Sequence, residues 1–220
     1  MLVPPYVLAW LVAGAEVTIK MTLMSAGLGF PLGIVAGIAR LSRWRLVRLV
    51  TGVYVQIFRG TSLLMQLFYF YFVFPFLGLK FDATVIGVVA LGLCLGAYAS
   101  EVVRGAILSV DPGQRDAAIA LNMKSWTAMR WVILPQAFVA MLPPFGNQVI
   151  EQLKATSLLS LITISELAFA GKKLLQTYGQ LSSIYFLVLV MYFVMNMPLS
   201  LFSRWLERRL SKGLHLGRVE

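Results

Sequence analysis

The chain has 220 residues, of which 59% are hydrophobic and only 13% are charged. Soluble proteins carry roughly 45–50% apolar and about 25% charged residues. A chain of this size has too little interior to hide the excess apolar surface from water. Its composition therefore argues against a soluble enzyme, a disordered chain and a coiled coil, and predicts an integral membrane protein.

The net charge is +10, from 19 Lys and Arg residues against 9 Asp and Glu residues. The basic residues cluster at the ends of apolar runs, as in the cytoplasmic loops of membrane proteins, so we expect no nucleic-acid partner. The single cysteine, Cys94, excludes an internal disulfide and a multi-cysteine metal site. The single histidine, His215, lies in a basic tail, so we expect no histidine-based metal site or catalytic triad.

The first apolar segment covers residues 1–20, and it lacks the positive start of a signal peptide. Because Pro4 and Pro5 make a poor first turn of a span, we predict a retained interfacial segment at 1–20. The first membrane span is then expected at 21–39, since about 20 apolar residues cross the hydrocarbon layer. This span carries a small residue at every fourth position, which favours close helix–helix contact: Gly29, Gly33 and Gly37.

The next apolar stretch is interrupted at Arg59-Gly60-Thr61, where the chain must turn or break. We predict a partly interfacial helix at 45–58 and a second span at 61–77. Three more spans are expected at 83–103, 132–152 and 184–205. A kink is expected at Pro143-Pro144, within the fourth of the five spans.

The segment 156–170 is apolar but short and contains Glu166, so a re-entrant or interfacial segment is favoured over a sixth crossing. With five spans, the basic clusters after the first and third spans and in the tail at 210–220 all face one side. The positive-inside rule makes that side cytoplasmic, which places the N-terminus outside and the C-terminus inside. The predicted fold class is thus an all-α membrane protein with about five crossings, its transmembrane domain covering 21–209.

The most informative polar stretch is the loop at 111–135. Asp111 followed by Pro112 is typical of a helix start. Asn122 is typical of a helix end in the left-handed conformation. Ser125 is a candidate N-terminal cap of a second short helix. Small residues between them give the first helix a low profile that fits another protein's groove. The alternative is an ordinary solvated loop.

This stretch resembles the "EAA" loop of the permease subunits of ABC importers, which reads Glu-Ala-Ala, three residues, Gly, nine residues, Ile, one residue, Leu-Pro. Three positions depart from that pattern, with Asp for Glu, Asn for Gly and Val for Ile, and each keeps its physical character. In the family this loop docks on the ATPase subunit. The resemblance therefore implies an ATPase-coupling role for Asp116, Ala117, Ala118, Asn122 and Pro135.

Further segments, spread over roughly residues 15–210, resemble the polar amino-acid subfamily of these permeases. They include Arg59-Gly60-Thr61, Glu101-Val102-Val103-Arg104-Gly105 and Leu153-Lys154-Ala155-Thr156-Ser157-Leu158. Many relatives have Asp where this chain has Ala155. If that acid holds a cationic group of the substrate, a basic amino acid is a less favoured substrate here.

The resemblance implies a type I ABC importer permease fold in the bacterial cytoplasmic membrane, multi-pass, moving a polar amino acid or a small zwitterion such as ectoine. Its partners would be a second permease subunit, the same or homologous, two ATPase subunits and an external solute-binding protein. No Gly-x-x-x-x-Gly-Lys-Ser/Thr loop occurs. We therefore expect no cofactor in this chain, with ATP and Mg bound by the partner ATPase.

Ionisable and polar side chains within spans are costly, and they are usually paired or functional. Glu101 with Arg104, and Glu151 with Lys154, have the spacing of helical ion pairs. The alternative to mutual neutralisation is a solute site, because transporters hold solutes near broken helices in the membrane. The predicted substrate-binding residues are Glu101, Asn147, Gln148, Glu151, Lys154, Thr156 and Ser157.

Two other functional classes remain as alternatives. One is a small membrane-embedded enzyme, which would need a catalytic set near the interface, and no acid pair stands near a nucleophile in this sequence. The other is a non-transporting membrane scaffold. Stimulation of ATP hydrolysis by the binding protein and its solute separates a permease from both.

Overall fold

The computed structural model describes residues 5–179 and 181–210. Within these ranges the chain is helical and forms no strand. The α-helices are α1 (Pro5–Ala39), α2 (Arg45–Gly60), α3 (Leu63–Phe68), α4 (Ala83–Leu108), α5 (Pro112–Ala120), α6 (Ser125–Ala128), α7 (Leu134–Ala155), α8 (Leu167–Tyr178) and α9 (Leu181–Leu210). This architecture confirms the predicted all-α class.

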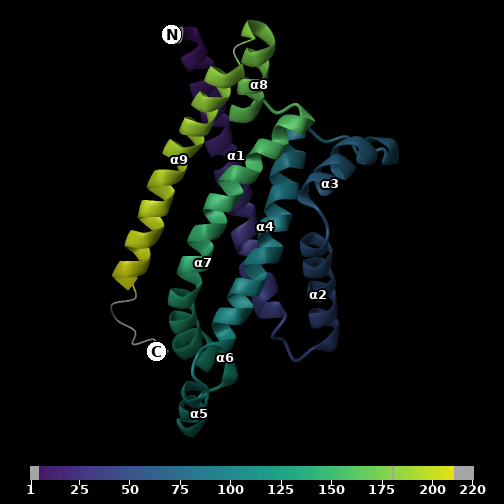
Figure 1. Cartoon of the computed structure of the whole chain (residues 1–220). Helices are drawn as coiled ribbons and strands as arrows, with labels where there is room; N and C mark the ends of the chain where they lie inside the picture. Colours follow the sequence, from purple (N-terminus) through teal and green to yellow (C-terminus); the bar gives the residue numbers. More distant parts are fainter. Residues whose placement is uncertain (1–4, 180, 211–220) are drawn as a thin grey trace.

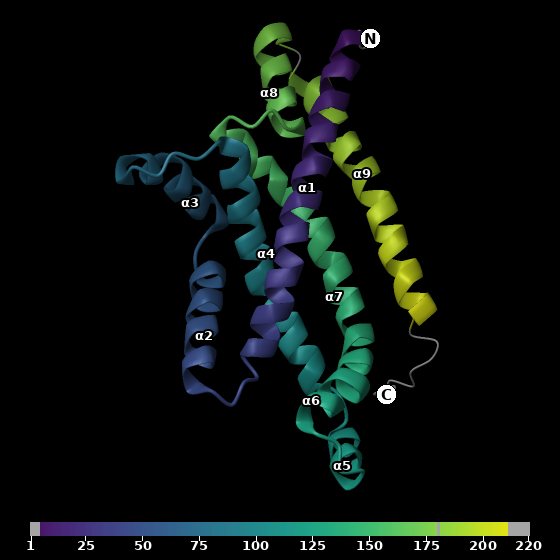
Figure 2. The same ribbon diagram turned by 180° about the vertical axis from the view of Figure 1, so that it is seen from behind.

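The long helices α1, α4, α7 and α9 run side by side, and α2 lies along one flank of the bundle (Figure 1). Helices α3 and α8 lie at one end of the bundle, whereas α5 and α6 lie at the opposite end, as the reverse view also shows (Figure 2). These two ends are called the α8 end and the α5 end below. Helix α1 begins at the α8 end, and α9 runs from there towards the α5 end.

Four helical stretches in the described residues are long and apolar enough to cross a membrane: Tyr6–Ala39, Ala83–Leu108, Ser125–Ile162 and Ser182–Arg209. A fifth crossing is available if the bent pair Arg45–Gly60 and Leu63–Leu77 counts as one span. This agrees with the expected five crossings. The tail at 210–220 lies outside the described residues from position 211 onward.

The structure shows no helix boundary at residue 20, because α1 runs unbroken from Pro5 to Ala39, and the interfacial placement of 1–20 stays a prediction. A proline costs nothing at the first helical position, where its missing N–H would have no partner anyway. The 35 residues of α1 extend over about 52 Å at the α-helical rise. The helix is therefore longer than the hydrocarbon layer and needs no break to fill it.

The predicted partly interfacial helix at 45–58 corresponds to α2, and the predicted second span at 61–77 corresponds to the segment that follows it; their placement in the membrane stays a prediction. Helix α2 runs along the bundle, while the segment after it bends away by 102° and lies across the α8 end. The bend falls at Thr61 and Ser62, directly after Gly60. The buried Val55 and the hydrogen bond from Tyr54 Oη to the Leu93 carbonyl at 2.7 Å anchor α2 to α4.

Two further expectations concern the last third of the chain. Helix α7 stays helical through Pro143 and Pro144, although these prolines remove hydrogen bonds to preceding carbonyls, and the kink expected there stays a prediction. After α7, a short 3-10 helix, Thr156–Ile162, leads to Thr163, whose φ of 68° turns the chain into α8. Helix α8 stays at the same end of the bundle, so this segment adds no sixth crossing.

The glycine stripe on α1 makes the close helix contact that its spacing predicts. A Cβ added at Gly33 would collide with the Cβ of Ala99 on α4, and one at Gly37 would lie 2.6 Å from the Cβ of Val103. At Gly29 an added Cβ would lie 2.8 Å from a Leu95 methyl group. The backbones of α1 and α4 therefore approach so closely that only hydrogen fits on the α1 side.

A buried carboxylate joins three helices at the α8 end. Glu166 caps α8 by accepting hydrogen bonds from the Phe169 N–H at 2.7 Å and the Ala168 N–H at 2.9 Å. The Tyr192 hydroxyl of α9 donates to the same carboxylate at 2.9 Å, and the Leu167 N–H donates to Thr18 of α1 at 3.1 Å. Burial raises the pKa of the Glu166 carboxyl, and these hydrogen bonds oppose the rise.

Replacing Glu166 with alanine should therefore lower the free energy of unfolding by about 3 kcal/mol, because a helix cap is lost and buried donors are left without acceptors. The measurement is the thermal unfolding of the detergent-solubilised protein. A matched control is Glu16→Ala on α1, which removes a carboxylate for which the structure shows no hydrogen bond or ion pair. Equal stability of the two variants would contradict the capping role.

Candidate functional site

Helix α5 is closed at both ends by local hydrogen bonds. Asp111 Oδ1 accepts from the Gly113 N–H at 2.7 Å, as expected for the capping residue. At the other end Asn122 takes a left-handed φ of 55°, and the Met123 N–H donates to the Ala118 carbonyl at 3.0 Å. Both ends of the predicted helix are thus confirmed.

The predicted coupling residues differ in exposure. Asp116 and Ala117 face solvent, whereas Ala118 is only 3% exposed and packs inward. Two apolar neighbours, Ile119 and Leu121, are 72% and 76% exposed. The loop therefore presents a small, partly apolar surface with an acid beside it. The last predicted coupling residue, Pro135, is exposed in the first turn of α7.

Ser125 is not the cap of α6. The position before α6 is held by Lys124, and no side chain caps that helix. The reason is that α6 is only four residues long and continues directly into the π-helical turn Met129–Ile133 and then α7. Ser125 instead lines a cavity.

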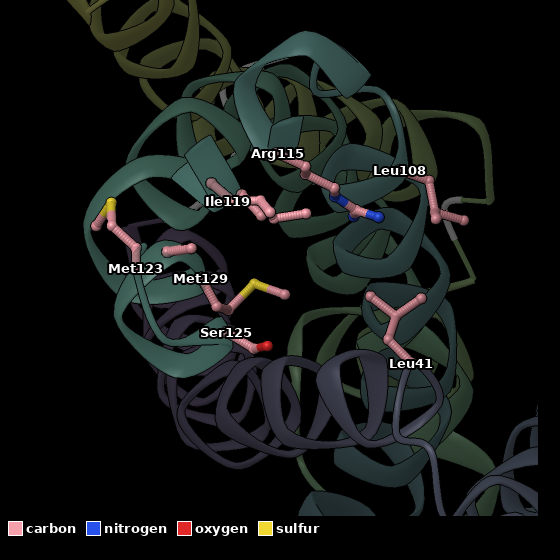
Figure 3. Close-up of a pocket in the computed structure, with 9 residues that line it drawn as sticks. Leu41, Leu108, Arg115, Ile119, Met123, Ser125 and Met129 are labelled. Atoms are coloured by element: carbon pink, nitrogen blue, oxygen red, sulfur yellow. The ribbon is translucent and has the colours of Figure 1, made fainter. Parts of the chain in front are cut away.

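This cavity, of about 290 Å³, lies between α5 and the ends of α1 and α4 (Figure 3). Its walls are mostly apolar, with Leu41, Leu108 and Met129 among the side chains that face it. Arg115 of α5 reaches the carbonyl of Ile107 at 3.4 Å. Gln136 at the start of α7 donates to Gln114 of α5 at 3.3 Å. These polar links attach α5 to two membrane helices at once.

A second cavity, of about 330 Å³, lies where α7 and α4 meet the α2–α3 bend, and it is called the groove below. Two predicted substrate-binding residues, Gln148 and Glu151, line it. The other walls come from sequence-distant segments, which are the bend, α4 and the end of α7. They contribute Thr61, Ser62, Leu63, Cys94, Leu95, Tyr98, Gln152 and Ala155.

The remaining predicted substrate-binding residues of α7 and the following turn do not line the groove. Asn147 and Lys154 are exposed beside it. The Thr156 and Ser157 hydroxyls bond to backbone carbonyls of their own chain turn, at 2.6 Å and 2.8 Å. Glu151 and Lys154 have ion-pair spacing, but no ion pair forms between them in the described structure.

Glu101 lies one helical turn beyond the groove and is held by three arginines. Its distance to a guanidinium nitrogen is 2.8 Å for Arg40, 2.8 Å for Arg59 and 3.2 Å for Arg104. The predicted pair with Arg104 is confirmed, and the other two partners come from the ends of α1 and α2. The Arg59 guanidinium also lies over the Tyr98 ring, 5.3 Å from its centre. Arg59 therefore connects the Glu101 cluster to the wall of the groove.

Sequence reasoning missed Ser62, Tyr98 and Gln152 as groove residues. The only local signal was the break at Arg59-Gly60-Thr61, which marks where α2 ends but not what it meets. Gln152 is 5% exposed and donates to Ser25 of α1 at 2.7 Å, a contact across 127 positions that no local pattern shows.

Four or five apolar crossings in the described residues, a groove with polar groups among them and a small-residue loop outside one end are the features of a multi-pass membrane permease. The chain belongs to the family "Binding-protein-dependent transport system inner membrane component", whose sequence model matches residues 29–212.

Known proteins of similar sequence and structure agree with this assignment. The chain is 44% identical to a probable amino-acid ABC transporter permease of Sinorhizobium fredii, over 90% of this chain and 86% of that protein. It is 36% identical to the glutamine transport system permease of Escherichia coli, over 91% of this chain and 92% of that protein. A crystal structure of an amino acid ABC transporter matches 95% of this chain and 100% of that chain, with a TM-score of 0.88 and 31% identity.

The chain is therefore the permease subunit of an ABC importer, a transporter component of the inner membrane and not an enzyme. Membership of this family implies partner ATPase and permease subunits and a binding protein. The enzyme and scaffold alternatives are not favoured.

Proposed function

We propose that this permease moves a polar amino acid or a similar small zwitterion, and that the groove holds the solute during passage. The relatives named above are permeases for amino acids, and one of them serves glutamine. That pattern favours an amino acid over ectoine. The observation that carries the solute site is the exposed carboxylate of Glu151, which has no ion-pair partner among the described residues and lies beside amide and hydroxyl groups in an otherwise apolar bundle.

The groove offers complementary groups for both ends of a zwitterion. Glu151 supplies an acceptor with negative charge for an ammonium group. The Gln148 amide, the Tyr98 phenol and the Ser62 hydroxyl supply donors for a carboxylate. Gln148 Oε1 is also buried without a hydrogen-bond partner in the described structure, so it can accept a hydrogen bond from an N–H group of the solute. Glu101 contributes by fixing Arg59 against Tyr98, Asn147 and Lys154 are exposed beside the groove, and Thr156 and Ser157 support the end of α7 through their bonds to backbone carbonyls.

The decisive experiment is uptake into vesicles by the permease assembled with its ATPase and binding protein, using a panel of amino acids. Glu151→Gln should reduce uptake of the preferred solute by about tenfold or more, because a charge-assisted hydrogen bond is worth about 1.5–3 kcal/mol. Glu207→Gln on α9 is the matched control. Unchanged uptake by the Glu151→Gln variant would contradict the proposal that the groove binds the solute.

Ala155 gives a second prediction, since it lines the groove at the position where the resemblance to the polar amino-acid subfamily leads us to expect an acid. Replacing Ala155 with aspartate should shift the preference towards basic amino acids by about tenfold relative to glutamine, because an added carboxylate favours a second cationic group. The measurement is competition between arginine and glutamine for uptake. Ala155→Asn matches the size without the charge and should leave the ratio unchanged. The same shift in both variants would contradict the electrostatic role of this position.

We further propose that the α5 end is cytoplasmic and that α5 is the coupling helix that docks on an ATPase subunit. Basic residues at this end support that side, which places the N-terminus outside and the C-terminus inside. Asp116 and Ala117 form the contact surface, Ala118 seats the helix, Asn122 fixes its end, and Pro135 starts the span that receives the motion. The assembly would hold two permease chains, identical or homologous, two ATPase chains that bind ATP and Mg, and one binding protein outside.

A further inference from the structure

We propose that the connection between α1 and α2 is a binding site for anionic phospholipid headgroups. The site, called the basic corner below, consists of Arg43, Trp44, Arg45 and Arg48. It lies at the α5 end of the bundle, where the chain leaves α1 and enters α2 (Figure 1). The partner is identified by its chemistry, a phosphate group carried on an apolar tail.

The first observation is charge without compensation. The sequence contains no Asp or Glu between Glu16 and Asp82, so the corner has no acid of its own. The three arginines of the corner are exposed, and none forms an ion pair among the described residues. The neighbouring Arg40, by contrast, forms an ion pair with Glu101. Three guanidinium groups are thus available to oxygen anions from outside the chain.

The second observation is an apolar surface continuous with these charges. Trp44 is 65% exposed between two of the arginines, as in the aromatic belts found at headgroup level. One face of α2 then shows a stripe of exposed aliphatic side chains at helical spacing, 49–70% exposed: Leu46, Leu49, Val50, Val53 and Ile57. Guanidinium groups at one end of an apolar stripe match the two parts of a phospholipid.

Local geometry keeps the corner in this shape. The Trp44 N–H donates to the Ser42 hydroxyl at 3.2 Å, and Arg48 Nη1 donates to the Ser42 carbonyl at 3.1 Å. Arg48 is thus partly fixed along the turn, while Arg43 and Arg45 form no hydrogen bond through their side chains in the described structure. Each basic residue near the membrane surface attracts anionic lipids by about 1 kcal/mol, or about fivefold in affinity.

The test uses the full-length permease, purified in detergent with its ATPase partner and titrated with phosphatidylglycerol in native mass spectrometry. The double variant Arg43→Gln/Arg45→Gln should bind phosphatidylglycerol about 25-fold more weakly than the wild type. The control Lys172→Gln/Lys173→Gln removes two exposed charges from α8 at the opposite end and should bind as the wild type does. Arg43→Lys/Arg45→Lys keeps the charge and should retain most of the affinity.

Three results would overturn the proposal. The first is equal binding of phosphatidylglycerol by the glutamine variant and the wild type. The second is a result for the wild type alone, so it does not depend on the folding of any variant. It is either equal binding of phosphatidylcholine and phosphatidylglycerol, or binding of phosphatidylglycerol that added salt does not weaken. The third is loss of the ATPase subunit from the glutamine variant at every lipid composition, which would make the corner a protein contact instead.

Discussion

Replacing Ala117 with tryptophan is expected to reduce ATP-driven uptake by more than tenfold while leaving membrane insertion intact. Ala117 faces solvent on α5, so a large side chain there is tolerated by the permease itself. A docked partner surface has no room for it, and a loss of about 1.4 kcal/mol in the contact already corresponds to tenfold weaker binding. Asp116→Lys should act in the same direction by reversing the charge at the contact.

The measurement is solute uptake into vesicles together with co-purification of the ATPase subunit, normalised to the amount of permease in the membrane. Thr177→Trp is the matched control, because it adds the same bulk at an exposed position of α8 at the other end. Ala118→Trp is unsuitable as a test, since Ala118 is buried and the loop itself would be disrupted. Full uptake with normal ATPase recovery in Ala117→Trp would exclude the coupling role of α5.

A second large effect is expected from Gly33→Leu, which should destabilise the permease by about 3 kcal/mol or prevent its accumulation in the membrane. A Cβ at this position collides with Ala99 on α4, so the two helices would have to separate along their contact. Overpacking of this kind costs about 1–3 kcal/mol, and the lost contacts of neighbouring glycines add to it. The measurement is thermal stability in detergent and the amount of folded protein recovered.

Gly27→Leu is the control for this variant, because a Cβ at Gly27 meets nothing within 4 Å. It should change stability by less than about 1 kcal/mol. A gentler pair isolates the contact itself: Gly33→Ala should be destabilising alone and largely rescued by Ala99→Gly on the facing helix. If Gly33→Leu and Gly27→Leu were equally stable, the close approach of α1 and α4 would not be needed.

Structural features that depend on a few consecutive residues could be predicted from the sequence. The start of α5 at Asp111, its left-handed end at Asn122 and the small-residue contact at Gly33 each depend on residues within about one helical turn. Their physical cause is local backbone geometry or side-chain size. A local pattern therefore carries enough information to predict them.

The packing of α2 along α4 could not be predicted in this way. The segments Arg45–Gly60 and Leu63–Leu77 qualify as a membrane span only when taken together, and α2 is held against α4 by the hydrogen bond from Tyr54 to the Leu93 carbonyl. The continuity of α7 through its two prolines is likewise set by its neighbours, because α7 packs on α4 and α9 along its length. Hydropathy alone contains neither piece of information.

The candidate groove was predicted only in part for a similar reason. Gln148 and Glu151 were found because they follow each other on one helix. Tyr98 and Ser62 face them only after three separate segments have come together. The Glu101 cluster shows the same limit: Arg104 is its neighbour in sequence, but Arg59 reaches it from 42 positions away.

The close contact of α1 with α4 has a mechanical consequence for the transport cycle. Two helices whose backbones touch along three glycines have almost no freedom to slide or rotate against each other. We therefore expect α1 and α4 to move as one rigid body. The movement that switches the permease between outward-open and inward-open states then takes place at less tightly packed connections, above all at the extended residues between α2 and α3. Spectroscopic labels on α1 and α4 should keep a constant separation through ATP turnover, while the separation between labels on α2 and α3 should change.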